Sequence, residues 1–108
     1  MVWLFSYGTL RQREVQLATF GRELEGGPDA LEGYVLGTVL IRDEAVVSTS
    51  GLAEHLILRP GDGVIEGVAL AVTPGELVAA DGYETDDYAR VEVTLRSGRR
   101  AFVYVAAN

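Results

Sequence analysis

Hydrophobic residues along this chain are grouped in short runs. Most runs are rich in β-branched or aromatic residues and are bounded by glycine, proline or polar residues, which is typical of β-strands. A glycine lies within two of them, Gly37 and Gly67, where a bulge or a close backbone approach is expected. The pattern predicts strands at Val2–Tyr7, Tyr34–Ile41, Ala45–Ser50, His55–Arg59 and Val64–Val72.

Turn signals separate these runs. The sequence Pro60-Gly61-Asp62-Gly63 predicts a turn that ends the fourth strand. Near the end of the chain, Arg90–Leu95 alternates polar and apolar residues, and Ala101–Val105 follows after Ser97-Gly98. Two alternating runs joined by such a dipeptide predict a β-hairpin.

Helix signals are fewer. Thr73-Pro74-Gly75-Glu76 has the spacing of a capping box with proline at the first helical position, so a short helix is expected up to about Gly82. Thr9 and Gln12 have the same spacing, which predicts a second helix from Leu10 to Phe20. The residues between Gly21 and Asp29 are expected to form a loop.

Six or seven short strands with two helices predict a small α+β domain whose mixed sheet is curled or barrel-like and flanked by short helices. A length of 108 residues and the absence of internal repeats favour one domain over residues 1–108.

Composition narrows the classes of function. The net charge of −7 disfavours nucleic acid and anionic membrane surfaces as partners, because both require basic residues. The absence of cysteine removes thiol nucleophiles, thiolate metal sites and disulfides. No apolar run is long enough for a membrane span or a signal peptide, so a cytoplasmic location is expected. The sequence does not predict an oligomeric state.

Candidate chemistry is carried by carboxylates. The chain lacks the motifs of serine hydrolases and nucleotide-binding loops, and its single histidine, His55, lies in an apolar run where a structural role is expected. An acidic cluster lacks the alternating order of a calcium loop, so no metal is expected. Its members are Asp81, Glu84, Asp86, Asp87 and Glu92.

Glu84 differs from its neighbours because it lies between Tyr83 and Tyr88 where a helix is predicted to end. Aromatic surroundings would raise the pKa of its carboxyl group and suit it to proton transfer near neutral pH. The alternative is an acidic loop exposed to solvent.

The turn at Tyr7-Gly8-Thr9-Leu10 is a second candidate. If a helix starts at Leu10, the amides of this turn lie at its N-terminus, where they and the helix dipole favour anions such as a carboxylate. Gly8 would let a ligand approach the backbone closely. The alternative is an ordinary capped turn between strand and helix.

Taken together, these segments resemble the γ-glutamylcyclotransferase-like family, which includes γ-glutamylamine cyclotransferases and plant AIG2-like proteins. The similar motifs keep their order over almost the whole chain. They are FSYGTLR at 5–11, LEGY at 31–34, VIEGVAL at 64–70, ADGYE at 80–84, YARVEV at 88–93 and AFVYV at 101–105.

The resemblance implies a barrel-like core and a reaction that requires no cofactor. The substrate's α-amine attacks its own γ-glutamyl carbonyl, which releases 5-oxoproline and a free amine. The family's Y-G-[ST]-L loop holds the γ-glutamyl group, which gives that role to Tyr7, Gly8, Thr9 and Leu10. The catalytic glutamate of its L-D-x-x-E-G motif corresponds to Glu84.

Two departures from the family pattern keep alternatives open. Ala80 and Thr85 replace the leucine and glycine of the glutamate motif, and 48–59 lacks a common Tyr-Pro or Phe-Pro pattern. A binding module without activity, specific for a small carboxylate or γ-glutamyl metabolite, is one alternative, and an amidohydrolase is another. Tyr88 is expected to line the pocket, and Tyr34, Tyr83 and Tyr104 are further candidates. Arg90 is expected to pair with a surface carboxylate.

Overall fold

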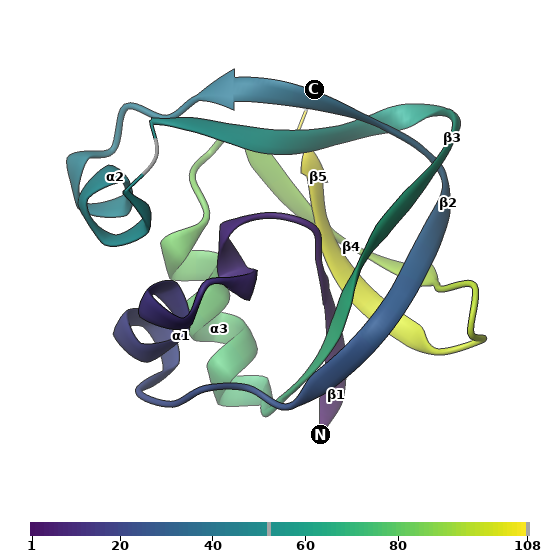
Figure 1. The fold of residues 1–108 in the computed structure, drawn as a ribbon, viewed down its shortest axis with the longest axis horizontal. Helices are drawn as coiled ribbons and strands as arrows, with labels where there is room; N and C mark the ends of the chain where they lie inside the picture. Colours follow the sequence, from purple (N-terminus) through teal and green to yellow (C-terminus); the bar gives the residue numbers. More distant parts are fainter. Residues whose placement is uncertain (52, 108) are drawn as a thin grey trace.

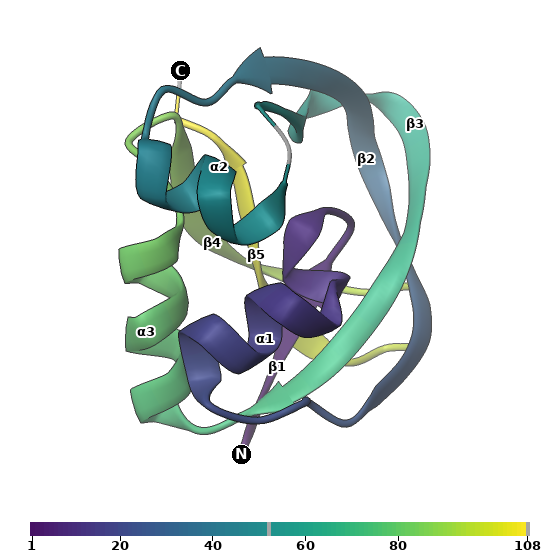
Figure 2. The same cartoon turned by 60° about the vertical axis from the view of Figure 1, so that its left-hand side comes forward.

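One mixed sheet forms the centre of the molecule and curls around part of its own core (Figures 1 and 2). The structure is a computed structural model that describes residues 1–51 and 53–107. Its elements are β1 Val2–Ser6, the 3₁₀ helix η1 Thr9–Arg11, α1 Arg13–Phe20, β2 Gly26–Leu40, α2 Glu44–Ser50, β3 Glu54–Val72, α3 Pro74–Tyr83, β4 Tyr88–Thr94 and β5 Arg100–Ala106. The expected α+β class with a curled, barrel-like sheet is confirmed.

The described strands lie in the order β2-β3-β1-β5-β4. All neighbours are antiparallel except β1 and β5, which run parallel. Strand β1 is therefore central, and its alternation places Leu4 and Phe5 in two different core clusters. The Leu4 cluster packs against the helices, and the Phe5 cluster lies within the curl of the sheet.

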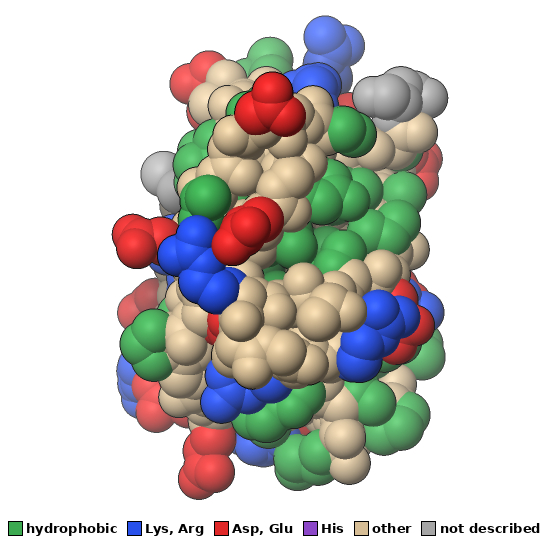
Figure 3. Space-filling view, turned by 90° about the vertical axis from the view of Figure 1, so that its right-hand side faces the viewer, with side chains coloured by type: hydrophobic (Ala, Val, Ile, Leu, Met, Phe, Trp, Pro, Cys, Tyr) green, Lys and Arg blue, Asp and Glu red, His purple; other side chains and the backbone are tan. Residues whose placement is uncertain are grey.

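The β2–β3 pair is longer than the sequence pattern predicts, and it replaces a predicted turn. Strand β3 continues through Pro60–Gly63, and the register with β2 shifts between Glu32 and Tyr34. Gly33 has φ 89°, a conformation that favours glycine. Residues that predict a turn therefore form a bulge, which lets one pair of strands bend across the whole molecule. Both strands expose large apolar side chains, including Val35 and Val64, and Figure 3 shows apolar groups on this face.

Gly67, rather than Gly37, marks the closest backbone approach to β1. A Cβ atom on Gly67 would lie 2.5 Å from the Ser6 carbonyl oxygen and 2.8 Å from the Phe5 ring. The absence of a side chain lets β3 pack directly against the end of β1. This packing sets the position of the turn that follows β1.

The predicted strand Ala45–Ser50 is wrong, because these residues form α2. Asp43 caps the helix by accepting hydrogen bonds from the amides of Ala45 and Val46. The helix buries Val46 in the cluster that contains Leu4. A run this short has no period that separates a strand from a helix, so the cap and the packing decide.

The predicted helix Leu10–Phe20 is divided into η1 and α1, which begins at Arg13. Thr9 and Gln12 do not form the predicted capping box, because neither helix has a side-chain cap. In contrast, α3 has the expected capping box, with reciprocal hydrogen bonds between Thr73 and Glu76. The predicted loop at 21–29 is too long, because β2 begins at Gly26.

The predicted hairpin is confirmed, since β4 and β5 pair in register with Val91 opposite Val103. Its turn contacts the start of β2 through Asp29, whose carboxylate accepts hydrogen bonds from the Ser97 amide and from Arg99 at 2.9 Å. The Arg99 guanidinium also lies 4.7 Å from the centre of the Trp3 ring. These contacts join the two halves of the curled sheet at one end. No helix within the described residues is long and apolar enough to cross a bilayer.

Candidate functional site

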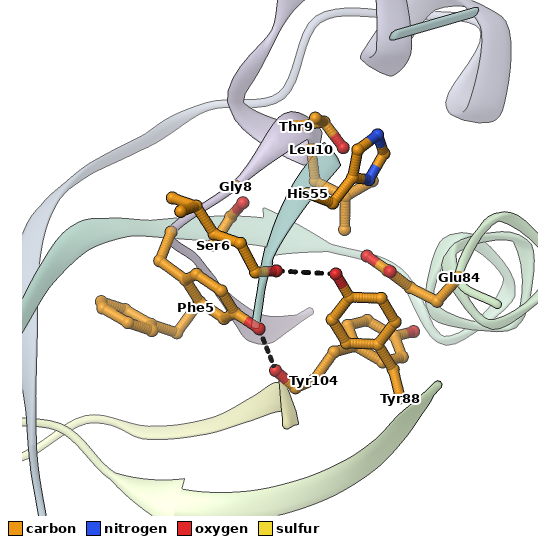
Figure 4. A pocket seen from close by; sticks show the side chains of 11 residues that line it. Phe5, Ser6, Gly8, Thr9, Leu10, His55, Glu84, Tyr88 and Tyr104 are labelled. Atoms are coloured by element: carbon orange, nitrogen blue, oxygen red, sulfur yellow. Dashed lines mark hydrogen bonds between the residues drawn. The ribbon is translucent and has the colours of Figure 1, made fainter. Parts of the chain in front are cut away.

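A pocket opens where the end of β1 meets the end of α3, next to the start of β3 and of β4 (Figure 4). Its cavity volume is small, about 20 Å³. Segments far apart in the chain form its walls. The lining residues are Phe5, Ser6, Tyr7, Gly8, Thr9, Leu10, His55, Leu56, Glu84, Tyr88 and Tyr104.

Glu84 is the one acidic residue among these. It is the C-terminal capping residue of α3, and its amide donates to the Ala80 carbonyl at 3.0 Å. Its carboxylate points into the pocket from the helix end (Figure 4). Burial raises the pKa of Glu84 to about 8. Burial is the one cause of this shift, and no hydrogen bond or charge from a described residue offsets it.

Tyrosines surround Glu84. Burial raises the pKa of Tyr7, Tyr88 and Tyr104, and the negative charge of Glu84 adds to each shift. The Tyr7 hydroxyl donates to the Tyr104 carbonyl at 2.6 Å, and the Tyr88 hydroxyl donates to the Leu56 carbonyl at 2.6 Å. Both phenols are therefore neutral donors already bound to backbone, and they define the walls around the carboxylate.

The turn after β1 presents backbone to the pocket. Tyr7 and Leu10 are buried on either side of it. The first amides of a helix have no acceptor inside it. Among the described residues, no backbone carbonyl outside η1 accepts from the amides of Gly8, Thr9 or Leu10. A Cβ atom on Gly8 would have no heavy atom within 4 Å, so open space lies beside this residue.

The Thr9 side chain contacts α3 rather than capping a helix. Its hydroxyl lies 2.7 Å from the Tyr83 hydroxyl, one residue before Glu84. Nearby, Ser50 Oγ lies 3.1 Å from Nε2 of His55. These contacts hold η1, α2 and the start of β3 around the end of α3.

The structure brings together all the residues that the sequence assigns to the site, namely Glu84, the turn Tyr7–Leu10 and Tyr88. Tyr104 also lines the pocket, whereas Tyr34 and Tyr83 are not among its lining residues. His55, for which a structural role is expected, contacts Ser50 and also lines the pocket. Sequence reasoning did not predict Phe5, Ser6 or Leu56, which have no chemical signal and enter through strand pairing.

Three of the other four acidic residues of the cluster have structural partners. Asp81 accepts a hydrogen bond from the Tyr104 hydroxyl at 2.6 Å and lies 3.5 Å from Arg90. Asp87 accepts from the Thr85 hydroxyl, and Glu92 pairs with Arg100. Among the described residues, no group of three or more His, Asp or Glu side chains is placed to hold a metal ion.

Comparison with known families agrees with this arrangement. The family model described as gamma-glutamyl cyclotransferase, AIG2-like, matches residues 4–108. The chain belongs to this family. No protein of curated function matches the sequence significantly.

Solved structures give the same fold. A Pyrococcus horikoshii protein described as uncharacterized has a TM-score of 0.66 at 20% identity, and the match covers 100% of this chain and 80% of that chain. Two Arabidopsis thaliana proteins solved in solution have TM-scores of 0.73 and 0.74 at 23% and 22% identity. Both matches cover 99% of this chain, and they cover 62% and 69% of the two Arabidopsis chains. At these identities the likeness concerns the fold.

Two positions that depart from the AIG2-like motif can now be placed. Ala80 is fully buried in the cluster between helices and sheet. The Thr85 hydroxyl donates to Asp87 at 2.8 Å, within the turn after α3. Neither side chain lines the pocket. Ala80 therefore affects only the support of Glu84, whereas Thr85 also lines a separate hollow beside Glu84, together with Arg42.

Proposed function

We propose that the protein is a γ-glutamyl cyclotransferase that cleaves a small γ-glutamyl amine or peptide into 5-oxoproline and a free amine. One observation carries the proposal. The carboxylate of Glu84 enters a pocket whose opposite wall is the turn Tyr7–Leu10. Family membership supports the type of reaction.

In this reaction the substrate's α-amino nitrogen forms a bond to its γ-carbonyl carbon, and the carbon–nitrogen bond to the leaving amine breaks. The attacking nitrogen loses a proton and the leaving nitrogen gains one. Glu84 takes the first proton and delivers the second, so a single carboxyl group returns to its initial state. The site would hold the glutamyl chain folded, which brings the amine close to the carbonyl that it attacks.

The turn after β1 would hold the γ-glutamyl group. Its free amides are donors suited to the α-carboxylate or to the oxygen that becomes negative during attack. Tyr7 and Tyr88 do not compete for this role, because their hydroxyls donate to backbone carbonyls. They shield the carboxylate from water instead.

The protonation states of Glu84 and of the substrate amine predict how kcat/KM depends on pH. With the pKa of Glu84 at about 8, its carboxyl group is mostly protonated at pH 7, and the substrate amine is mostly an ammonium ion. One proton must leave this pair before attack. We therefore expect kcat/KM to increase with pH through about 8 and then to level off.

Replacement of the carboxyl group tests the assignment. Glu84→Gln keeps the shape but cannot accept a proton, so 5-oxoproline formation from a panel of γ-glutamyl amines should decrease at least about 100-fold. Glu92→Gln is the matched control, because Glu92 belongs to the same acidic cluster but pairs with Arg100 outside the pocket. Equal rates for Glu84→Gln and wild type would show that the assignment is wrong.

Gly8→Ala tests the turn separately from the fold. The added methyl group meets nothing in the free protein, so the melting temperature should stay close to that of wild type. The same methyl group would occupy the space beside the free amides, so we expect KM to increase. Unchanged KM together with unchanged stability would remove the turn from the substrate site.

A binding module without turnover is the second candidate, and the altered neighbours of Glu84 favour it. It predicts an increased melting temperature with γ-glutamyl compounds and no product. Mass spectrometry of the reaction separates the remaining alternative, because an amidohydrolase releases free glutamate instead of 5-oxoproline.

A further inference from the structure

A second cavity shares walls with the Glu84 pocket. Its volume is about 320 Å³, and it is lined by Gly8, Thr9, Arg11, Gln12, Glu54, His55 and Leu56. Gly8, Thr9, His55 and Leu56 also line the first pocket, so a molecule that extends past the turn enters the second.

Arg11 is the one arginine in the walls of these two cavities. Six of the nine arginines are ion-paired, namely Arg13, Arg22, Arg90, Arg96, Arg99 and Arg100. Within the described residues, Arg11 has no carboxylate partner. Its Nε donates to the Gly8 carbonyl at 3.2 Å, which holds the guanidinium group at the wall common to both cavities and leaves its terminal nitrogens available.

An available guanidinium group matters in a chain of net charge −7, because such a chain repels anions in general. Arginine is the side chain best suited to a carboxylate, since its fork of donors can bind both oxygens. If the glutamyl part of a substrate lies beside Glu84, the leaving amine extends along the shared wall. Its body then lies within reach of Arg11.

We propose that Arg11 binds a carboxylate on the leaving amine, so that the preferred substrates are γ-glutamyl amides of amino acids rather than of uncharged amines. This inference rests on the proposed cyclotransferase function. Glu54 is the acidic residue of the second cavity and comes from β3. The negative charge of Glu54 repels a carboxylate on the leaving amine. Arg11 should therefore favour the charged substrates, and Glu54 should disfavour them.

Two substrates that differ only in this group provide the test. γ-Glutamyl-alanine and γ-glutamyl-ethylamine have leaving amines that differ by one carboxylate. Wild type should prefer the alanine compound in kcat/KM. Arg11→Gln should decrease kcat/KM for the alanine compound roughly fivefold and leave the ethylamine compound unchanged. Glu54→Gln should increase the preference for the alanine compound.

Arg59→Gln is the matched control, because it removes the same charge from an arginine outside both cavities. It should leave the substrate preference unchanged, as measured alongside the melting temperature of each variant. The affinity for 5-oxoproline, which carries the glutamyl carboxylate but no leaving group, should also be unaffected by Arg11→Gln.

Three outcomes would overturn the proposal. Equal losses for both substrates, with weaker binding of 5-oxoproline, would assign Arg11 to the glutamyl carboxylate instead. Equal kcat/KM of wild type for both substrates would exclude recognition of the leaving group while the cyclotransferase function stands. If neither substrate gives 5-oxoproline, the cyclotransferase function itself is overturned and, with it, the role of Arg11.

Discussion

Burial removes hydration from the carboxyl group of Glu84, and no hydrogen bond or charge from the described residues offsets this loss. Its protonated form is therefore favoured in the folded protein. The same shift that suits Glu84 to move protons near pH 8 makes its ionised form costly to the fold. A single residue thus connects the proposed chemistry to stability.

Stability against pH tests this connection. The raised pKa means that the contribution of Glu84 is fully present below pH 4.5 and is lost as the pH rises toward about 8. Glu84→Gln cannot ionise, so at pH 7 it should be more stable than wild type by on the order of 3 kcal/mol.

Urea unfolding at pH 4 and pH 7 measures this difference. The two proteins should have similar free energies of unfolding at pH 4. If the difference in free energy of unfolding is the same at both pH values, the pKa of the Glu84 carboxyl group is not raised.

At the scale of elements, the site depends on contacts between segments that are separate in the sequence. The Thr9–Tyr83 hydrogen bond joins η1 to the last turn of α3, and the Ser50–His55 contact joins α2 to the start of β3. Glu84 follows Tyr83 directly. The position of the Glu84 carboxylate relative to the turn therefore depends in part on a hydrogen bond between two side chains.

A double-mutant cycle measures this bond. Tyr83→Phe and Thr9→Val each remove one hydroxyl group with little change of shape, and each should decrease the free energy of unfolding by about 1 kcal/mol. The double variant should lose less than the sum, by about 0.5–1.5 kcal/mol, because the second change has no bond left to break. Additive losses would show that the two hydroxyls do not interact.

Elements with local signals could be predicted from the sequence. The capping box of α3 and the β4–β5 hairpin depend on residues close together in the chain. The strand expected at Ala45–Ser50 was wrong because a short apolar run fits either element. The turn expected at Pro60–Gly63 was wrong because a bulge and a turn use the same residues.

The residues of the candidate site also divide into those that the sequence indicates and those that it does not. Glu84 and the turn Tyr7–Leu10 stand out by residue type and motif, and the structure places them around one pocket. Leu56 and Ser6 line it because β1 and β3 bring them there. Such residues depend on strand register over long sequence distances, which the local pattern does not specify.

Across the whole molecule, the end of the sheet opposite the pocket is held by Asp29. Its side chain is only 2% exposed and accepts hydrogen bonds from Ser97 and Arg99. Burial alone would raise the pKa of Asp29, but hydrogen bonds from Ser97, the Ala30 amide and Arg99 outweigh it and lower the pKa to about 2. The ionised carboxylate is thus part of what joins β2 to the β4–β5 turn.

Acid unfolding tests this role. A lowered pKa means that the contribution of Asp29 is present above pH 4 and is lost as the pH falls toward 2. We expect Asp29→Asn to be less stable than wild type by about 2 kcal/mol at pH 6 and nearly equal at pH 2. Asp62→Asn, at an exposed position of β3, controls for the loss of charge. A difference that does not decrease at low pH would exclude the carboxylate as the cause.

The parallel pairing of β1 with β5 has a consequence for the order of assembly. The turn Tyr7–Leu10 leaves the ribosome before β5, yet the Tyr7 hydroxyl binds the carbonyl of Tyr104. During synthesis β1 can pair on one side only, with β3, until β5 emerges, and long-range pairing of this kind forms slowly. A nascent chain can therefore build its helices and the β2–β3 pair while the pocket is still open, and β5 then completes it.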